Sequence, residues 1–156
     1  MKKLLLLLTM VSLPTFASVS ANVSIASDYI WRGMTQTDGI AVSGGFDYAA
    51  DGGFYAGIWG SNVNFNDSTG EGNGAEFDYY FGYGFEMGGV GVDLGYVAFD
   101  YPGNEDDLDF EEIVLGLSMG DLGLTFAMGQ DGAPDYTEVS YGIGACLLYT
   151  SDAADD

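Results

Sequence analysis

The stretch that decides the fold class is Ala75-Glu76-Phe77-Asp78-Tyr79-Tyr80-Phe81-Gly82-Tyr83-Gly84-Phe85-Glu86. Every second residue is aromatic, and these residues are Phe77, Tyr79, Phe81, Tyr83 and Phe85. The positions between them are mostly acidic residues and glycines. Successive side chains of a strand point to opposite faces of a sheet, so this period of two predicts a β-strand with one aromatic and one polar face.

The same alternation predicts further strands on both sides of this stretch. They are Asn22–Arg32, Ile40–Ala49, Phe54–Phe65, Val90–Tyr101, Phe110–Met119, Leu122–Gly129 and Tyr136–Ala145. In the first of them, the predicted apolar face is Val23, Ile25, Tyr29 and Trp31. In Phe54–Phe65 one face holds Tyr55, Trp59, Val63 and Phe65, whereas Phe54 and Ile58 lie on the other. The apolar parity of Val90–Tyr101 changes between Tyr96 and Val97, which predicts a β-bulge there.

Composition and connection lengths indicate an all-β antiparallel transmembrane β-barrel, with about eight strands present. The chain has 25 glycines, 11 tyrosines and 10 phenylalanines but only 3 prolines, which favours strands over helices. The predicted connections alternate between long and short along the chain. Outer-membrane barrels of bacteria show this order, because short turns lie on the periplasmic side and longer loops lie outside. A soluble β-sandwich also alternates apolar and polar residues, so this second fold stays open.

The two ends of the chain differ from the part between them. Residues 1–21 are typical of a signal peptide, with Lys2 and Lys3, an apolar stretch from Leu4 to Leu13, and a cleavage site after Ala21. The apolar stretch is too short for a membrane-spanning helix, which needs about 20 residues. Residues 146–156 resemble the translation of a sequencing adapter and contain the only cysteine, Cys146. We therefore expect residues 22–145 to be part of a barrel from a truncated gene.

Acidic residues dominate the charge of the chain. The formal net charge is -21, and Arg32 is the only basic residue after Lys3. Binding of nucleic acid requires Lys and Arg side chains to replace counterions at the phosphates, so nucleic acid is not an expected partner.

The polar parity of the predicted strands is expected to face the lumen, because a charged side chain in lipid is costly. Phe81 would then face lipid, whereas Gly82 and the other inward glycines would leave space in a water-filled interior. The candidate lumen-lining residues are Asp28, Arg32, Asp47, Glu76, Asp78, Glu86, Asp93, Glu112 and Glu138.

Several segments resemble the TorF-type porin family, a family of bacterial outer-membrane proteins first catalogued as conserved hypothetical proteins (Gcw_chp-like). The resemblance rests on Ser27-Asp28-Tyr29-Ile30-Trp31-Arg32-Gly33 and on Gly53-Phe54-Tyr55-Ala56-Gly57-Ile58-Trp59-Gly60-Ser61-Asn62. It extends through Glu76-Phe77-Asp78-Tyr79-Tyr80 to about Gly103. The resemblance implies a β-barrel in the outer membrane.

Catalysis and cofactors are not expected. The chain has no histidine and no cysteine before Cys146, so the usual pairs of nucleophile and base are missing. A loop with Glu105, Asp106, Asp107 and Asp109 offers oxygen ligands of the kind that calcium and magnesium prefer. Weak, loose binding of a divalent cation is the only metal interaction that the sequence predicts.

The leading functional hypothesis is a porin-like channel for small solutes that prefers cations because its lumen is acidic. Its surroundings would be outer-membrane lipid and lipopolysaccharide. Two alternatives remain open at this point. A small closed barrel of eight strands would have a filled interior and would serve as an anchor or a surface-interaction protein. A secreted soluble β-sandwich would instead pack its aromatic faces together and bind a ligand.

Overall fold

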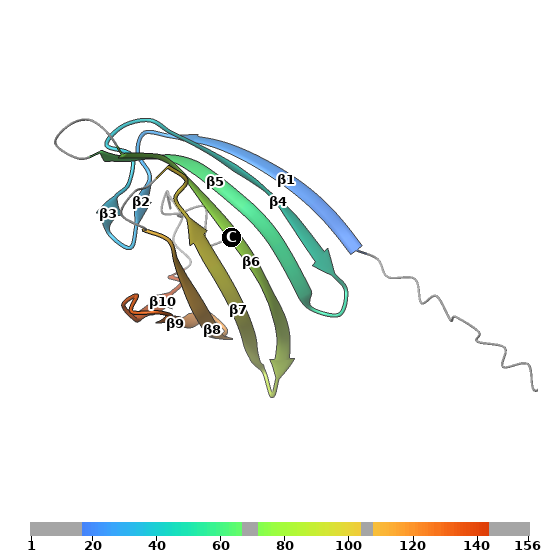
Figure 1. Ribbon diagram of the computed structural model, residues 1–156. Coiled ribbons are helices and arrows are strands. Elements are labelled where there is room, and N and C mark those ends of the chain that lie inside the picture. Colours follow the sequence, from blue (N-terminus) through green and yellow to red (C-terminus); the bar gives the residue numbers. More distant parts are fainter. Residues whose placement is uncertain (1–16, 67–71, 104–107, 144–156) are drawn as a thin grey trace, which may run out of the picture.

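The computed structural model describes residues 17–66, 72–103 and 108–143. Eight strands form one antiparallel sheet in which neighbours in the sequence pair with each other. They are β1 (Ala17–Ala26), β4 (Ala41–Ala50), β5 (Phe54–Asn66), β6 (Gly72–Met87), β7 (Val90–Asp100), β8 (Phe110–Met119), β9 (Leu122–Gly129) and β10 (Tyr136–Tyr141). Figure 1 shows that the sheet is strongly curved, with β1 at one edge and β10 at the other. The all-β, antiparallel prediction is confirmed, and the sheet is not closed into a barrel.

The predicted strand positions agree well with the structure from β4 onward, and β8 and β9 have the predicted bounds. The strand predicted at Asn22–Arg32 is correct as far as Ala26 and wrong beyond it. β1 ends at Ala26, and a small hairpin follows, formed by β2 (Ile30–Trp31) and β3 (Met34–Thr35).

β1 also begins at Ala17, inside the predicted signal peptide, so cleavage after Ala21 would remove the first five residues of this strand. Within the described ranges, no helix is long and apolar enough to cross a membrane.

The break after Ala26 has a local cause in hydrogen bonds that compete with the sheet. The backbone N–H of Tyr29 donates to the Thr37 hydroxyl oxygen at 2.9 Å, and the Gln36 N–H donates to the Tyr29 carbonyl at 2.7 Å. The Gln36 carbonyl in turn accepts from the N–H of Asn64 in β5 at 2.7 Å. Because the backbone groups of Tyr29 are satisfied inside the loop, the chain leaves the β1 edge and folds toward the concave side.

The sheet has an apolar convex face and a polar concave face, which we call the outer and inner faces. In β6 the parity is as predicted: Phe77, Tyr79, Phe81, Tyr83 and Phe85 are on the outer face and between 38% and 51% exposed. Strand registers place each inner residue beside another inner residue, for example Asp78 beside Trp59 of β5 and beside Phe99 of β7. Outer residues of β1 are the most exposed, with Val23 at 80% and Ile25 at 76%.

The predicted β-bulge between Tyr96 and Val97 is wrong. The pairing of β7 with both neighbours runs without a register shift through these two residues. The change of apolar parity has another cause, because Val97 and Phe99 are apolar residues on the inner face, where they join a buried cluster. The register shift that does occur lies in β5, between Asn62 and Phe65 opposite β6.

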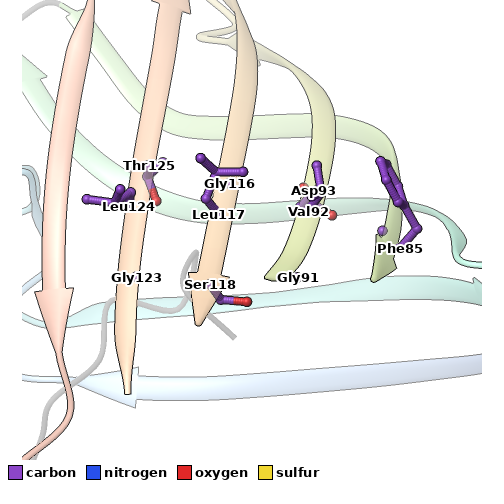
Figure 2. A pocket seen from close by; sticks show the side chains of 11 residues that line it. Phe85, Gly91, Val92, Asp93, Gly116, Leu117, Ser118, Gly123, Leu124 and Thr125 are labelled. Carbon is purple, nitrogen blue, oxygen red and sulfur yellow. The ribbon is translucent and has the colours of Figure 1, made fainter. Parts of the chain in front are cut away.

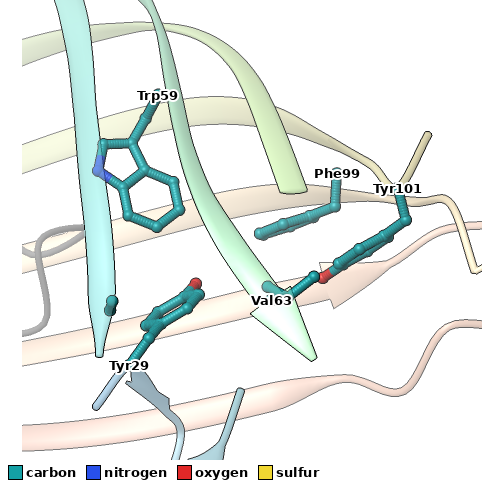
Figure 3. Packing of buried hydrophobic residues seen from close by; sticks show 6 residues of the cluster. Tyr29, Trp59, Val63, Phe99 and Tyr101 are labelled. Atoms are coloured by element: carbon teal, nitrogen blue, oxygen red, sulfur yellow. The ribbon is translucent and has the colours of Figure 1, made fainter. Parts of the chain in front are cut away.

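The inner face has two halves with different packing. Near the short turns, residues of β6 to β9, small ones on the inner parity, line an open pocket of about 430 Å³ (Figure 2). Near the long loops, a cluster of aromatic residues fills the concave side (Figure 3), and its buried members are Tyr29, Ala41, Trp59, Val63, Phe99 and Tyr101. Trp31 packs against this cluster, with its ring centre 5.7 Å from that of Phe99.

This cluster corrects the face assignment for two strands. Tyr29 and Trp31 do not share the outer face with Val23 and Ile25, because the hairpin carries them inside. In β5 the face with Trp59 and Val63 is the buried inner one, whereas Phe54 on the opposite face is 43% exposed. The sequence grouped the β5 residues correctly. It predicted that their aromatic face points outward, however, and this face points inward.

Several inner glycines lie under tyrosine rings instead of leaving open space. A Cβ atom on Gly82 would come within 2.3 Å of the Tyr55 ring, and one on Gly57 would lie within 2.6 Å of three Tyr80 ring and hydroxyl atoms. The tyrosines therefore lie flat across neighbouring strands, which a side chain at the glycine positions would prevent. The expectation that Gly82 leaves room in the interior is wrong.

We predict that Gly57→Ala destabilises the folded protein by about 1 to 3 kcal/mol, because the added methyl group overpacks the Tyr80 ring. The effect should shrink in a Tyr80→Ala background, where the ring is absent, so a double-mutant cycle in urea unfolding measures the coupling. Gly84→Ala is the matched control, because its nearest neighbour would be an Asp93 carboxylate oxygen at an ordinary 3.4 Å. Equal costs for Gly57→Ala with and without Tyr80 would contradict this packing.

Candidate functional site

The inner face and the hairpin above it hold most of the acidic residues that the sequence marks as lumen candidates. Asp47, Glu76, Asp78, Asp93, Glu112, Glu138 and Glu86 have the inner parity of their strands. Asp28 lies in the loop after β1, and Arg32 lies at the tip of the β2–β3 hairpin. The burial of these groups differs widely. Glu76 and Glu112 are 1% exposed and Asp78 is 5% exposed, whereas Glu86 at the turn end of β6 is exposed.

Arg32 forms a two-pronged ion pair with Glu112 of β8. Its Nη1 atom lies 2.6 Å from Glu112 Oε1, and its Nη2 atom lies 2.7 Å from Oε2. The guanidinium group also lies between two aromatic rings, 4.2 Å from the centre of Trp31 and 4.1 Å from the centre of Tyr136. This planar cation matches the carboxylate fork and both ring faces, a combination that lysine cannot supply. The interaction joins the hairpin after β1 to β8 and β10.

The backbone of the hairpin tip supports this placement of Arg32. Arg32 and Gly33 are the two residues between the paired Trp31 and Met34, and their φ angles are +47° and +80°. Two positive φ angles are typical of the tight two-residue turns that connect the strands of a β-hairpin. A non-glycine residue in this region costs about 1 to 3 kcal/mol, so contacts elsewhere must hold it there. The ion pair and the two ring contacts of Arg32 are those contacts.

Glu76 of β6 is held by tyrosines instead of a cation. The Tyr29 hydroxyl donates to Glu76 Oε1 at 2.8 Å, and the Tyr101 hydroxyl is a second donor to this carboxylate. Burial, and then the nearby Glu76 carboxylate, raise the pKa of Tyr101, so this phenol stays protonated and remains a donor. The two tyrosines come from the loop after β1 and from the end of β7. Glu76 therefore ties both segments to the sheet.

Two further tyrosine–aspartate pairs cross the inner face lower down. The Tyr55 hydroxyl donates to Asp93 Oδ1 at 2.7 Å, two strands away from β5, and its ring covers Gly82. The Tyr80 hydroxyl donates to Asp47 Oδ1, two strands away from β6, and its ring covers Gly57. Each pair has the same plan: a tyrosine lies over a cross-strand glycine and reaches an aspartate one strand further.

Asp28 and Glu138 have local hydrogen-bonded roles. The hydroxyl groups of Thr37 and Thr35 donate to Asp28 at 2.6 and 3.2 Å, and the Thr37 hydrogen bond holds the pKa of the Asp28 carboxyl below its usual range. This side chain therefore closes the loop of residues 27–39. Glu138 Oε2 accepts from the Tyr136 hydroxyl at 2.9 Å, beside the ring on which Arg32 stacks.

The predicted divalent-cation loop falls mainly outside the described residues, which exclude Glu105, Asp106 and Asp107. Asp109 is described, and its Oδ1 atom accepts from the backbone N–H of Tyr101 at 2.8 Å. Among the residues that the structure describes, no group of three or more acidic or other metal-ligating side chains is placed to hold a metal ion.

Sequence reasoning missed the tyrosines that organise this face, namely Tyr29, Tyr55, Tyr80 and Tyr101. One signal was present in the sequence: Tyr80 interrupts the polar parity of β6, between Asp78 and Gly82. An aromatic residue among acids and glycines on a polar face indicates a ring that lies across the sheet. The partner aspartates could not be assigned from this signal, because they are 33 and 38 residues away along the chain.

We predict that Arg32→Met destabilises the protein by about 3 to 5 kcal/mol, because it leaves the buried Glu112 carboxylate without a cation. The double variant Arg32→Met with Glu112→Leu should be more stable than Arg32→Met alone. The only two tryptophans, Trp31 and Trp59, both lie in the inner cluster, so tryptophan fluorescence during urea unfolding reports on it directly. Arg32→Lys is the matched control, because lysine keeps the positive charge but cannot form the paired hydrogen bonds to both Glu112 oxygens. If Arg32→Met alone is as stable as the double variant, the unpaired Glu112 carboxylate is not the cause of the destabilisation.

Comparison with known proteins identifies the family of this chain. A family model described as a bacterial protein of unknown function (Gcw_chp) matches residues 14–144, which includes every strand of the sheet. No curated protein and no solved structure matches the chain. Since the match covers more than half of the chain, this protein belongs to the Gcw_chp family.

Proposed function

We propose that this chain forms the wall of an outer-membrane β-barrel that lets small solutes pass, with a preference for cations. The observation that carries the proposal is the reversed distribution of polarity. The largest fully buried side chains are two glutamates, Glu76 and Glu112, whereas large apolar side chains cover the convex face. Apolar area that stays in water contributes nothing to stability, whereas transfer of the same area into lipid would contribute roughly 25 cal/mol per Å². The TorF-type porins that the sequence resembles are expected to share this environment.

The outer face carries an apolar band of about the right height for a membrane. In β6 the band runs from Phe77 to Met87, ten residue steps that span about 34 Å along a strand and about 24 Å along the membrane normal if the strand is tilted by about 45°. The apolar band of outer-membrane barrels is about 25 Å tall. The carboxylates with outer parity, Asp100 and Glu111, lie at the loop ends of β7 and β8, where headgroups and water would meet them.

A soluble β-sandwich is less well supported. A sandwich requires a second sheet that packs on the aromatic face. In the described part of the chain, no element covers this face, and Phe81 and Tyr83 remain 51% and 48% exposed. The aromatic residues that do pack together are on the inner face instead.

Insertion into a membrane requires closure of the sheet edges. β1 and β10 are the two ends of the described sheet and do not pair with each other. Unpaired backbone groups in hydrocarbon cost several kcal/mol each, so in a membrane these edges pair with each other or with additional strands. Arg32 already links the loop after β1 to Tyr136 at the start of β10, which brings the two edges toward each other at the loop end.

One observation favours a second function, that of a closed anchor or surface-interaction protein. The loop half of the interior is filled by the hairpin of residues 30–35 and the aromatic cluster, so a barrel with this half sealed would not conduct. The turn half is open, and its pocket is lined by glycine, serine and threonine together with Asp93 and four apolar residues. Measurement of conductance therefore separates the two functions.

We predict that Phe81→Arg costs up to roughly 2 to 4 kcal/mol of folding free energy in lipid vesicles, because the charge would lie in hydrocarbon at mid-strand. Thr137→Arg is the matched control on the same face, at the loop end of β10, where the cost should be about 0 to 1 kcal/mol. Urea-dependent folding into vesicles measures both. A soluble protein would tolerate arginine at this exposed position, so equal small effects would contradict the membrane proposal.

We also predict that the protein conducts in planar bilayers and that its reversal potential in a salt gradient shows preference for cations. The reason is the excess of inner carboxylates over the one cation, Arg32, which is already paired with Glu112. Preference for anions would contradict the acidic-pore proposal. A folded, membrane-inserted protein without conductance would show that the interior is sealed and would favour the anchor.

A further inference from the structure

We infer that Asp47 and Asp93 are the residues that determine the charge preference of the pore. This inference rests on the proposed function and names the specificity-determining side chains within it. Selecting for cations requires a carboxylate that a passing ion can reach and whose charge no protein cation cancels. These two requirements divide the inner carboxylates into separate groups.

Three of the inner carboxylates fail the first requirement, which is that an ion can reach them. Glu76, Asp78 and Glu112 are between 1% and 5% exposed, so an ion in the interior does not reach them. Glu112 fails the second requirement as well, because both of its oxygens bind the Arg32 guanidinium. Glu138 lies beside the same cation, since its donor Tyr136 is one of the two rings that contact Arg32.

Asp93 meets both requirements. It is the only charged residue that lines the open pocket of the turn half, and the others on the inner parity are small residues such as Gly84, Gly116 and Ser118 (Figure 2). Its Oδ1 atom accepts from the Tyr55 hydroxyl, a neutral donor that leaves the negative charge in place. The only cation after Lys3 is Arg32, which is engaged by Glu112.

Asp47, on β4 of the same inner face, also meets both requirements, although it does not line this pocket. It is partly exposed, its Oδ1 atom accepts from the Tyr80 hydroxyl, and its Oδ2 atom accepts from the Asn22 amide at 3.3 Å. Both donors are neutral. Asp47 and Asp93 each lie three residues from the short-turn end of their strands, β4 and β7. The two carboxylates are therefore uncancelled charges in the turn half of the inner face.

The size of the effect follows from electrostatics. One charge about 6 Å from the path of an ion in water changes the local ion concentration by roughly threefold. Ions in solution screen this effect, with a Debye length of about 10 Å at 0.1 M salt and about 3 Å at 1 M. Removal of both charges should therefore lower cation preference at low salt much more than at high salt.

The test compares the reversal potentials of wild type, Asp47→Asn with Asp93→Asn, and Glu86→Gln in planar bilayers with a potassium chloride gradient. We expect the ratio of cation to anion permeability in the double variant to fall by at least roughly threefold at about 0.1 M salt. Glu86 also meets both requirements, but it is exposed at the turn end of β6, where solvent ions screen its charge from the interior, so Glu86→Gln should change the permeability ratio less. Folding of each variant into vesicles is checked in parallel.

The outcomes separate this inference from the proposed function. If wild type conducts with cation preference and the folded double variant keeps the wild-type ratio, Asp47 and Asp93 are not the determinants, although the pore proposal stands. A larger change in Glu86→Gln than in the double variant would also overturn the inference and would place selectivity at the mouth. If folded wild type does not conduct at all, the pore proposal fails, and this inference fails with it.

Discussion

The burial of Glu112 is the constraint on which the rest of the inner face depends. Glu112 is 1% exposed and, unlike Glu76, is paired with a cation, Arg32, which is the only basic residue in the chain after Lys3. To reach Glu112, the segment after β1 leaves the sheet edge and turns inward through a hairpin whose tip has two positive φ angles. Tyr29 and Trp31 are carried inside with it. The ion pair thus holds the tip of the hairpin, and together with the hydrogen bonds of Tyr29 and Gln36 it keeps Tyr29 and Trp31 on the inner side.

The cluster and the tyrosine pairs divide the interior into two levels. At the loop end, Tyr29 and Tyr101 hold Glu76 among packed rings, and water has little access. At the turn end, glycines remove side chains from the wall, so that tyrosines can lie flat and a pocket of about 430 Å³ remains open. Glycine therefore has two roles on the inner face. Gly57 and Gly82 make room for a tyrosine ring, whereas Gly84 and Gly116 border open space.

The outer face is consistent with the proposed membrane environment. A sheet that buries carboxylates and exposes rows of Phe, Tyr, Val and Leu side chains gains little from the hydrophobic effect in water. In a bilayer, the apolar band is matched by lipid and the backbone hydrogen bonds of the sheet gain strength from the low dielectric. The membership in the Gcw_chp family, which matches residues 14–144, applies to this whole sheet.

The sequence alone determined the strands and, for most of them, the two faces, because a period of two is a local property that each strand carries by itself. β6, β8 and β9 were predicted in this way with the correct parity. The tertiary structure decided which way the β5 face with Trp59 points, where Tyr29 and Trp31 go, and which of the candidate carboxylates are accessible. These features depend on contacts between residues 33 to 80 positions apart, such as Tyr80 with Asp47 and Arg32 with Glu112. Local alternation contains no information about such pairs, since curvature of the sheet and the inward turn of one loop bring them together.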